Sequence, residues 1–274
     1  MKNFKNGETG ERFMGIIETK LPRVPEIQDL RLDEVYIKES KRQWFLGEGK
    51  LDGLEEALSL KEVADIDKGN VLDVACGCGE RAYFLAEVSP NFDITAIDID
   101  PRCIETAQAR YRPMPPNLHF KLGDVYDLSA YHEMDMVTTS QALHHFDRLE
   151  DALAQILQAM KRGAEFYFMD LNREHLPCYE GETQLPGGRK VPKAHFIYEV
   201  RKKVPDNEFA EAFLKNEIFD HRQSAHTNRM EILTICSYIA AYTPLEVQQA
   251  MSKAGFRIIE ITRKGGLMSG IGLK

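Results

Sequence analysis

The stretch VLDVACGCGE, residues 71–80, decides the fold of this 274-residue chain. Its first five residues are mostly apolar and predict a buried strand, which runs into a loop of small residues and then into a helix. Small residues at positions 75, 77 and 79 let backbone N–H groups approach a ligand closely, and the helix start adds a partial positive charge. The loop therefore predicts a binding site for an anionic or polar group.

Short apolar runs alternate with helical patterns from residue 70 onward, which is typical of β-α units around a parallel sheet. Five strands are expected at 71–75, 92–98, 118–122, 134–140 and 165–171, and three crossover helices at 80–89, 101–112 and 149–162. Asp100 followed by Pro101 predicts the start of the second helix, and Gly163 predicts the end of the third.

The C-terminal residues complete the predicted sheet. Thr243-Pro-Leu-Glu246 is a capping box and opens a helix that should end at Gly255. Two strands follow at 256–263 and 267–273, and the Lys-Gly-Gly turn between them predicts an antiparallel hairpin. We therefore predict an α/β fold with a doubly wound, seven-stranded mixed sheet whose last strand is antiparallel.

Two stretches do not follow the β-α alternation. Residues 1–69 are expected to form an N-terminal helical cap, and residues 172–242 an insertion after the fifth strand. An insertion of about 70 residues is long for an α/β connection, and long loops beside strand ends commonly carry function. We expect residues 70–171 and 243–274 to form the core and the insertion to form a substrate lid.

Charge and composition narrow the classes of partner. Lys and Arg total 35 against 43 Asp and Glu, so the net charge of −8 offers no general basic surface for a phosphate backbone. Five Cys at irregular spacing predict reduced thiols, and no metal site is expected. The longest apolar-rich run, 232–242, has about half the length that spans a bilayer. We expect a cytoplasmic protein without a membrane segment, and nucleic acid is disfavoured as a partner.

Acidic residues at the ends of three predicted strands narrow the ligand. Gly77-x-Gly79-x-x-Ala82, with Asp98 21 residues after Gly77, satisfies the pattern of a dinucleotide site, so an NAD-dependent dehydrogenase is one interpretation. Asp73 inside the first strand and Asp124 after the third favour instead a small adenosine with a charged amino-acid tail. Asp100 is expected to cap a helix rather than to bind ribose.

Several segments in this order resemble the class I, Rossmann-like S-adenosylmethionine-dependent methyltransferases: LDVACGCG, ITAIDID, GDV, DMVTTSQALHHF and MKRGAEFYFMD. The resemblance covers residues 70–171 and 243–273 and implies S-adenosyl-L-methionine as cofactor, with S-adenosyl-L-homocysteine as product. It implies cofactor contacts from Asp73, Ala75, Cys76, Gly77 and Gly79 at the methionine end, Asp98 at the ribose, Asp124 and Val125 at the adenine, and Ile99, Ser140 and Gln141 beside them. Ala75 stands where the family motif has its first Gly.

Methyl transfer from a sulfonium needs an acceptor lone pair in line with the S–CH3 bond. Orientation contributes about 7–11 kcal/mol, against about 3–5 kcal/mol for a general base. A base therefore helps a hydroxyl acceptor and is dispensable for a neutral amine. The catalytic candidates are His144 and His145 after the fourth strand and Asp170 at the end of the fifth. The candidates for the substrate wall are Tyr179, His195, Tyr198 and His221 in the insertion and Trp44 in the cap.

The leading hypothesis is a methyltransferase that acts on an oxygen or nitrogen of a small organic acceptor, with natural-product tailoring as an analogy. The segment after the fourth strand lacks the Asn/Asp-Pro-Pro-aromatic signature of enzymes that methylate planar amide or base nitrogens. A tRNA- or peptide-modifying methyltransferase stays open because Arg189, Lys190, Lys193 and residues 201–203 form a basic run. A cofactor-binding scaffold without activity is a third hypothesis. The sequence is compatible with a homodimer.

Overall fold

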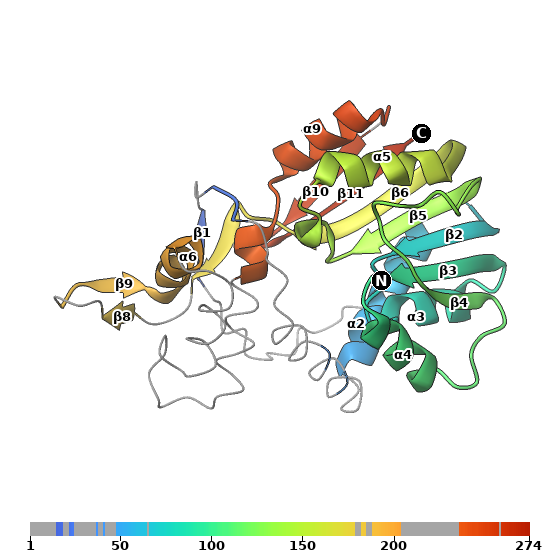
Figure 1. The fold of residues 1–274 in the computed structure, drawn as a ribbon, viewed down its shortest axis with the longest axis horizontal. Coiled ribbons are helices and arrows are strands. Elements are labelled where there is room, and N and C mark those ends of the chain that lie inside the picture. The colour runs from blue at the N-terminus through green and yellow to red at the C-terminus, as the bar shows by residue number, and fades with distance from the viewer. Residues whose placement is uncertain are drawn as a thin grey trace, which may run out of the picture.

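The computed structural model describes residues 15–18, 22–24, 37, 41, 48–64, 66–178, 182–184, 188–203, 236–257 and 259–274. Figure 1 shows a large α/β part built around one sheet and a smaller group of short elements beside it. Three of the predicted substrate residues, Trp44, Tyr179 and His221, lie outside the described residues.

Seven strands form one mixed sheet in the large part. In spatial order they are β10 (Ile259–Lys264), β11 (Leu267–Leu273), β6 (Met160–Leu171), β5 (Met134–Ser140), β2 (Gly69–Val74), β3 (Phe92–Asp98) and β4 (Leu118–Leu122). The strands from β2 to β6 pair in parallel, whereas β11 is antiparallel to both β6 and β10. The predicted seven-stranded mixed sheet with an antiparallel last strand is confirmed.

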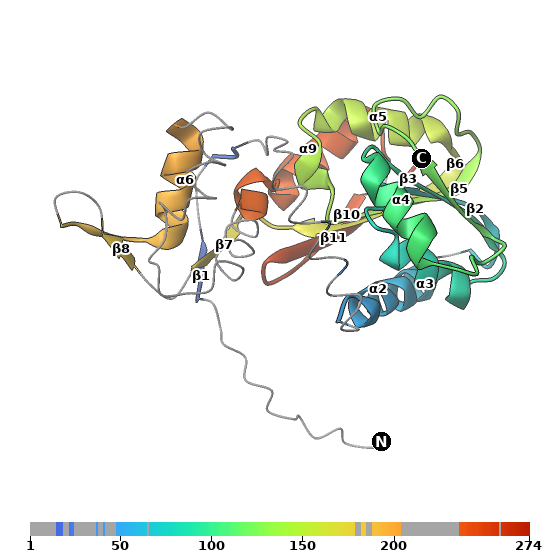
Figure 2. The same ribbon diagram turned by 60° about the horizontal axis from the view of Figure 1, so that its bottom comes forward.

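Helices cover both faces of the sheet, as Figure 1 and Figure 2 show. On one face lie α2 (Glu48–Val63), α3 (Glu80–Val88) and α4 (Pro101–Arg110), and on the other lie α5 (Leu149–Ala159) and α9 (Pro244–Ala254). Successive strand residues point to opposite faces. Val71 therefore joins the core under the first three helices, whereas its neighbour Leu72 joins the core under α5 and α9. The sheet is doubly wound, as predicted.

Two helix starts follow local signals in the sequence. Asp100 caps α4, because its carboxylate accepts a hydrogen bond from the backbone N–H of Arg102 at 2.8 Å. Thr243 and Glu246 form the predicted capping box of α9. The N–H of Thr243 donates to Glu246 Oε2 at 2.7 Å, and the N–H of Glu246 donates to Thr243 Oγ1 at 3.2 Å. α9 ends at Gly255, whose φ of +109° favours glycine.

The prediction of a helix over 149–162 that stops at Gly163 is wrong. Met160 already belongs to β6, and Gly163, with a φ of +80°, lies within that strand. The register between β5 and β6 shifts between Met134 and Met136, which accommodates extra residues on β6 near the glycine. The buried, apolar Met160 fits both the helical period and the inward side of a strand, so periodicity alone does not separate the two structures.

The smaller group of elements in Figure 1 comes from the two stretches that do not follow the β-α alternation, residues 1–69 and 172–242. β1 (Gly15–Glu18) pairs antiparallel with β7 (His175–Cys178), β8 (Glu182–Gln184) pairs antiparallel with β9 (Lys190–Pro192), and α6 (Lys193–Lys203) follows. The group lies beyond the ends of β5 and β6, on the left of Figure 1. Because β1 comes from one stretch and β7 from the other, the described parts of 1–69 and 172–242 contact each other directly.

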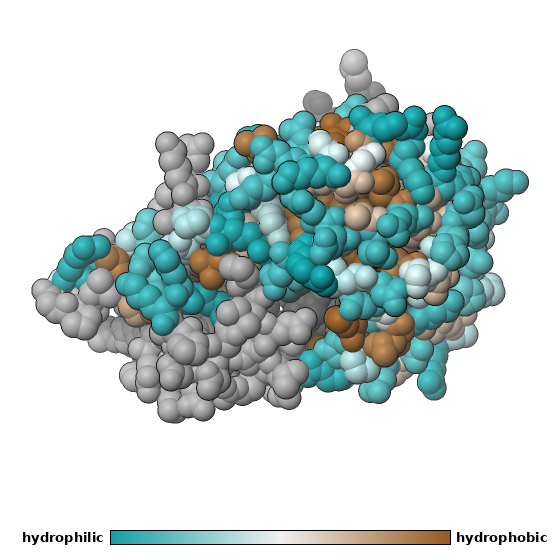
Figure 3. All heavy atoms as spheres, turned by 45° about the horizontal axis from the view of Figure 1, so that its top comes forward, coloured by the Kyte–Doolittle hydropathy of each residue, from teal (hydrophilic) through white to brown (hydrophobic). Residues whose placement is uncertain are grey.

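The surface in Figure 3 mixes hydrophobic and hydrophilic residues on the face that it shows. Among the described residues, the large hydrophobic side chains that are exposed are Leu58, Ile99, Leu122 and Leu245. They come from different parts of the chain, and two of them, Ile99 and Leu122, lie at the ends of the paired strands β3 and β4. None of the helices in the described ranges is long and apolar enough to span a bilayer.

Candidate active site

The loop between β2 and α3 has an unusual backbone. Ala75, Gly77 and Gly79 have positive φ angles of 54°, 56° and 84°. For a residue other than glycine this conformation costs about 1–2 kcal/mol, so Ala75 carries strain. A Cβ on Gly79 would also lie 2.5 Å from the ring of Phe120, so a larger residue cannot occupy that position without a shift of the ring. The backbone of this loop thus accounts for the small residues at 75, 77 and 79.

Asp98 at the end of β3 is held by the loop. Its Oδ2 accepts a hydrogen bond from the N–H of Gly77 at 2.8 Å, and its Oδ1 accepts one from the N–H of Asp100 at 2.9 Å. Burial raises the pKa of Asp98, and these two hydrogen bonds lower it in part. Cys76, the residue before Gly77 in the loop, donates its N–H to Ile97 O at 2.9 Å. Burial raises the pKa of the Cys76 thiol. The carboxylate of Asp98 is therefore oriented by the protein itself.

Asp73 in β2 is almost completely buried and is held by a residue that the sequence analysis missed. The guanidinium of Arg81 contacts the Asp73 carboxylate and donates to Thr138 Oγ1 at 2.9 Å. Burial raises the pKa of Asp73 to about 6; Arg81 opposes this shift and the carboxylate of Glu56 adds to it. Gln141 contacts Glu56, with its Nε2 3.5 Å from Glu56 Oε1. An acid and a base side by side complement the ammonium and carboxylate of an amino acid.

Arg81 carries a signal that could have identified it. It lies in the first turn of α3, where a positive side chain opposes the partial positive charge of the helix N-terminus. A cation in that position is unfavourable for the helix alone, so an acidic partner on the neighbouring strand could have been sought from the sequence.

Two exposed apolar residues lie at strand ends close to the third acidic residue. Ile99 is 57% exposed and Leu122 is 61% exposed, and they lie at the adjacent ends of the paired strands β3 and β4. Asp124 comes next, and its Oδ1 accepts a hydrogen bond from the N–H of Tyr126 at 2.9 Å. The side chain of Val125 faces the core. Exposed apolar surface beside a carboxylate suits a planar base that bears an amino group.

His144 and Asp170 form a buried pair between the ends of β5 and β6. His144 belongs to the 3₁₀ turn η1 (Leu143–His145), and its Nδ1 lies 2.7 Å from Asp170 Oδ1. Asp170 also accepts two backbone hydrogen bonds, from the N–H of His144 at 2.9 Å and from the N–H of Leu171 at 2.6 Å. A carboxylate that accepts from Nδ1–H orients the imidazole and makes Nε2 its basic nitrogen.

His145 connects this pair to the end of β3. Its ring centroid lies 4.0 Å from that of His144, and the side chain is exposed. Its positive form is close enough to Asp98 to lower the pKa of that carboxyl. Ser140 at the end of β5 has a buried Oγ that lacks a hydrogen-bond partner among the described residues. The structure thus brings the predicted residues of β2, β3, β5 and β6 together at one edge of the sheet.

Four buried polar atoms beyond β6 lack a hydrogen-bond partner within the described ranges: Asn172 Nδ2, Arg173 Nη1, His195 Nε2 and Tyr198 OH. Arg173 Nη2 donates to both carboxylate oxygens of Glu246, at 2.7 and 2.9 Å. Burial raises the pKa of Tyr198, and Arg173 lies close enough to oppose that shift. A buried polar group without a partner costs about 1–3 kcal/mol, so these four atoms need partners that the described residues do not supply. The sequence predicted His195 and Tyr198 but missed Asn172 and Arg173.

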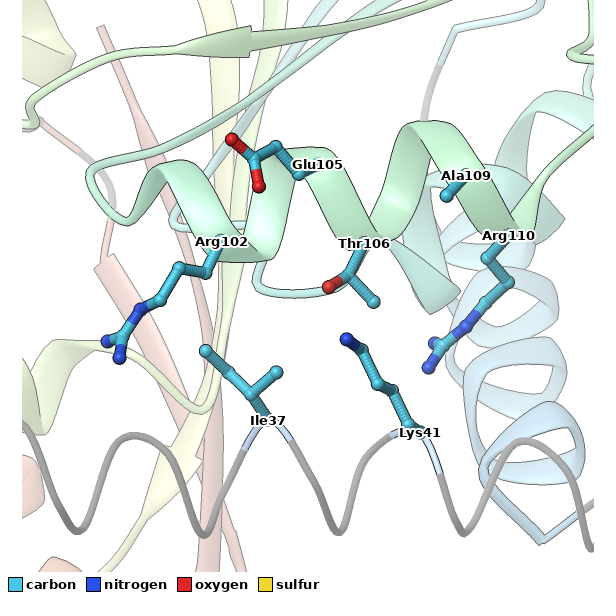
Figure 4. A pocket seen from close by; sticks show the side chains of 7 residues that line it. All are labelled: Ile37, Lys41, Arg102, Glu105, Thr106, Ala109 and Arg110. Atoms are coloured by element: carbon cyan, nitrogen blue, oxygen red, sulfur yellow. The ribbon is translucent and has the colours of Figure 1, made fainter.

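A cavity of about 700 Å³ lies elsewhere, beside α4, as Figure 4 shows. Its lining residues are Ile37, Lys41, Arg102, Glu105, Thr106, Ala109 and Arg110. None of them is a predicted site residue. Arg102 is paired with Asp100 at 2.6 Å, and Arg110 is paired with Glu80. The predicted site residues therefore lie at the strand ends and not in this cavity.

The strand ends fit an adenosine with an amino-acid tail. The acid–base pair suits the tail, the oriented carboxylate of Asp98 suits ribose hydroxyls, and the buried Oγ of Ser140 requires a polar partner. In the sheet order β10-β11-β6-β5-β2-β3-β4, strand β2 lies between β5 and β3. The loop of small residues that follows β2 is therefore at the centre of the site. Fold and site together resemble those of the class I, Rossmann-like S-adenosylmethionine-dependent methyltransferases.

Comparison with known proteins agrees with this class. Residues 71–163 match the family model of a methyltransferase domain. Over 118 residues the chain is 31% identical to the probable phthiotriol/phenolphthiotriol dimycocerosates methyltransferase 2 of Mycobacterium ulcerans, covering 43% of each chain. Over 156 residues it is 27% identical to the demethylmenaquinone methyltransferase of Leptospira interrogans, covering 56% of this chain and 57% of that one. The chain spans about half the length of these curated relatives.

Solved structures show the same fold. A methyltransferase of Corynebacterium glutamicum that depends on S-adenosylmethionine matches with a TM-score of 0.52 at 13% identity, over 90% of this chain and 100% of that one. Human N-acetylserotonin methyltransferase in complex with S-adenosylmethionine matches with a TM-score of 0.52 at 17% identity, over 88% of this chain and 57% of that one. At these identities the likeness shows the fold alone.

Proposed function

We propose that the chain transfers the methyl group of S-adenosylmethionine to an oxygen or nitrogen of a small organic acceptor by in-line displacement. The observation that carries this proposal is the buried His144–Asp170 pair beside the strand ends that suit the cofactor. When bound, the cofactor supplies a methyl group activated by a sulfonium. The residues of the chain bind it, exclude water and manage the proton of the acceptor.

Four acidic or basic residues would hold the cofactor. Asp73 and Arg81 would pair with the ammonium and carboxylate of the methionine end, since they already lie side by side. Asp98 would accept from the ribose hydroxyls, and Asp124 from the adenine amino group beside Ile99. The remaining residues assigned to the cofactor are Ala75, Cys76, Gly77, Gly79, Val125, Ser140 and Gln141.

His144 would be the general base for a hydroxyl acceptor. Asp170 accepts the Nδ1 hydrogen, so Nε2 takes the hydroxyl proton while the acceptor oxygen bonds to the methyl carbon. When bound, the cofactor would supply the methyl carbon and its sulfur as the leaving group. Such a base contributes about 10²–10⁴-fold in rate. For a neutral amine acceptor the pair mainly orients the nitrogen, and His145 stays the second candidate.

The acceptor would lie beyond β6. Tyr198 and His195 would contact it together with Asn172 and Arg173. Most of the buried atoms of these residues that lack a hydrogen-bond partner within the described part of the chain are donors, which favours an acceptor rich in oxygen. Tyr179, His221 and Trp44 stay predictions because they lie outside the described residues.

A tRNA- or peptide-modifying activity draws less support from the basic run than the sequence suggested. Arg201 is buried, and Lys203 pairs with Glu199 at 3.0 Å, whereas Arg189 and Lys190 are exposed. Part of the run is therefore not presented to a phosphate backbone.

The proposal also includes a cytoplasmic location, which cell fractionation tests, and a homodimer, which light scattering tests.

The proposal is tested by methyl transfer from labelled cofactor into three pools: small-molecule extract, total RNA and total protein. We expect label in the small-molecule pool, and a His144→Gln variant should lose about 100-fold or more in kcat without a change in S-adenosylhomocysteine affinity. His119→Gln is a matched control, because His119 is a half-exposed histidine paired with Asp93 at 3.1 Å. Label confined to RNA or protein would contradict the proposal of a small organic acceptor. Full turnover by His144→Gln would contradict the proposal that His144 is the general base.

A further inference from the structure

Arg23, in the N-terminal stretch, contacts the loop that carries His144. Its Nη2 donates to the carbonyl O of His144 at 3.0 Å, and its Nε donates to Ala240 O at 2.5 Å. The guanidinium carbon lies 4.1 Å from the ring centroid of Tyr242, and Nη2 lies 3.4 Å from Asp147 Oδ1. One largely buried side chain thus joins three segments: the N-terminal stretch, the loop around η1, and the end of the insertion.

Contacts on either side of Arg23 join the same segments. The N–H of Val24 donates to Ile239 O at 3.2 Å, and Tyr242 OH donates to Phe146 O at 2.6 Å. The N–H of His144 is held by Asp170, so Arg23 and Asp170 between them bind both backbone polar groups of His144. The position of this histidine therefore depends on a residue far away in the sequence.

We infer that Arg23 is a positioning residue, which holds His144 against Asp170 when residues 22–24 and 236–242 are docked on the η1 loop. The inference rests on the proposed function, which makes His144 the base. Arginine suits this role because its planar fork of donors serves two carbonyls while its face stacks on a ring, whereas lysine offers one ammonium. The contacts of residues 22–24 and 236–242 with the η1 loop thus help to hold the imidazole of His144 against Asp170.

The first test is steady-state kinetics of Arg23→Ala with the acceptor found in the pools. We expect kcat to fall about 10- to 100-fold, because a displacement of about 1 Å can cost 10²-fold, while the KM for the cofactor and the affinity for S-adenosylhomocysteine stay unchanged. Arg148→Ala is the matched control. Arg148 stacks on Tyr126 at 4.2 Å and pairs with Asp151 at 3.2 Å, but it is exposed, and its variant should keep the wild-type kcat.

Arg23→Lys keeps the inference testable if the alanine variant does not fold. It should melt like the wild type and still show a lowered kcat, because one ammonium cannot replace the planar fork that donates to both carbonyls while its face stacks on Tyr242. A wild-type kcat in either Arg23 variant overturns the inference. So does an equal loss of kcat in Arg148→Ala.

A double variant separates this inference from the proposed function. If Arg23 acts through His144, adding Arg23→Ala to His144→Gln costs no further kcat, whereas an additional loss contradicts the inference. Full turnover by His144→Gln alone contradicts the proposed base instead. Without any acceptor, the ring NMR signals of His144, assigned by their loss in His144→Gln, should shift in Arg23→Ala and not in Arg148→Ala. Unshifted signals overturn the inference.

Discussion

Cofactor affinity is expected to fall between pH 7 and pH 5 because Asp73 loses its charge in that range. Burial raises the pKa of Asp73 from 3.8 to about 6. Asp73 is then about 90% ionised at pH 7 and about 10% ionised at pH 5, and only the ionised form pairs with an ammonium group. The Kd for S-adenosylhomocysteine should therefore rise about tenfold, or about 1.4 kcal/mol. An Asp73 with its ordinary pKa would stay ionised and give almost no change.

Isothermal calorimetry over this pH range measures the effect, and two arginine variants locate its cause. Arg81→Gln should move the midpoint to a higher pH, because Arg81 lowers the pKa of Asp73. Arg102→Gln is the matched control: Arg102 also lies in the first turn of a helix and pairs with Asp100, and its variant should leave the midpoint unchanged. Asp73→Asn should bind weakly at every pH.

One ligand distinguishes Asp73 from other titrating groups. 5′-Methylthioadenosine lacks the amino-acid tail, so its affinity should not follow the ionisation of Asp73. If the wild type binds S-adenosylhomocysteine equally well at pH 5 and pH 7, or if methylthioadenosine shows the same pH dependence, the assignment of Asp73 to the methionine end is refuted.

Three further substitutions test other parts of the site. Asp170→Asn should lower kcat by about 10²–10⁴-fold in steady-state assays, because the imidazole loses its orienting carboxylate, and calorimetry should show unchanged cofactor affinity. Ala75→Gly should raise the free energy of unfolding by about 0.5–1 kcal/mol in urea titrations, because glycine tolerates the φ of 54°, and an equal or lower stability would contradict strain at this residue. Tyr198→Phe removes a hydroxyl that has no hydrogen-bond partner among the described residues and should raise the acceptor KM about tenfold without a loss in Tm, and an unchanged KM would exclude Tyr198 from the acceptor site.

The elements that were predictable carry their signals locally. The strands expected at 92–98, 118–122 and 134–140 have the bounds of β3, β4 and β5, because each is a short stretch with apolar residues, continuous or alternating, between turn residues. The caps at Asp100 and Thr243 depend on contacts within one helical turn. The helix end at Gly163 failed because Met160 satisfies two periodicities at once, and only pairing with β5 decides between them.

The acidic residues of the candidate site were predictable, and their partners were not. An acidic residue at a strand end can be predicted because the strand itself can be recognised in the sequence. Parallel strands end at the same edge of the sheet, so such residues are expected to lie together. Arg23 reaches His144 across 121 residues of sequence, and Arg173 reaches Glu246 across 73. Long side chains of this kind follow no sequence period, so their contacts appear only when the tertiary structure brings the segments together.

The charges of the candidate site also give a physical reason for it to distinguish cofactor from product. Glu56 and Asp98 both raise the pKa of Asp73, so two partly exposed carboxylates lie near the buried pair of Asp73 and Arg81. This excess of negative charge is unfavourable in the protein alone, and a cationic ligand relieves it. Under the proposed function, the cofactor arrives with a sulfonium and an ammonium, whereas the product has lost the sulfonium charge. The arrangement that attracts the methyl donor therefore holds the spent product less strongly and favours its release.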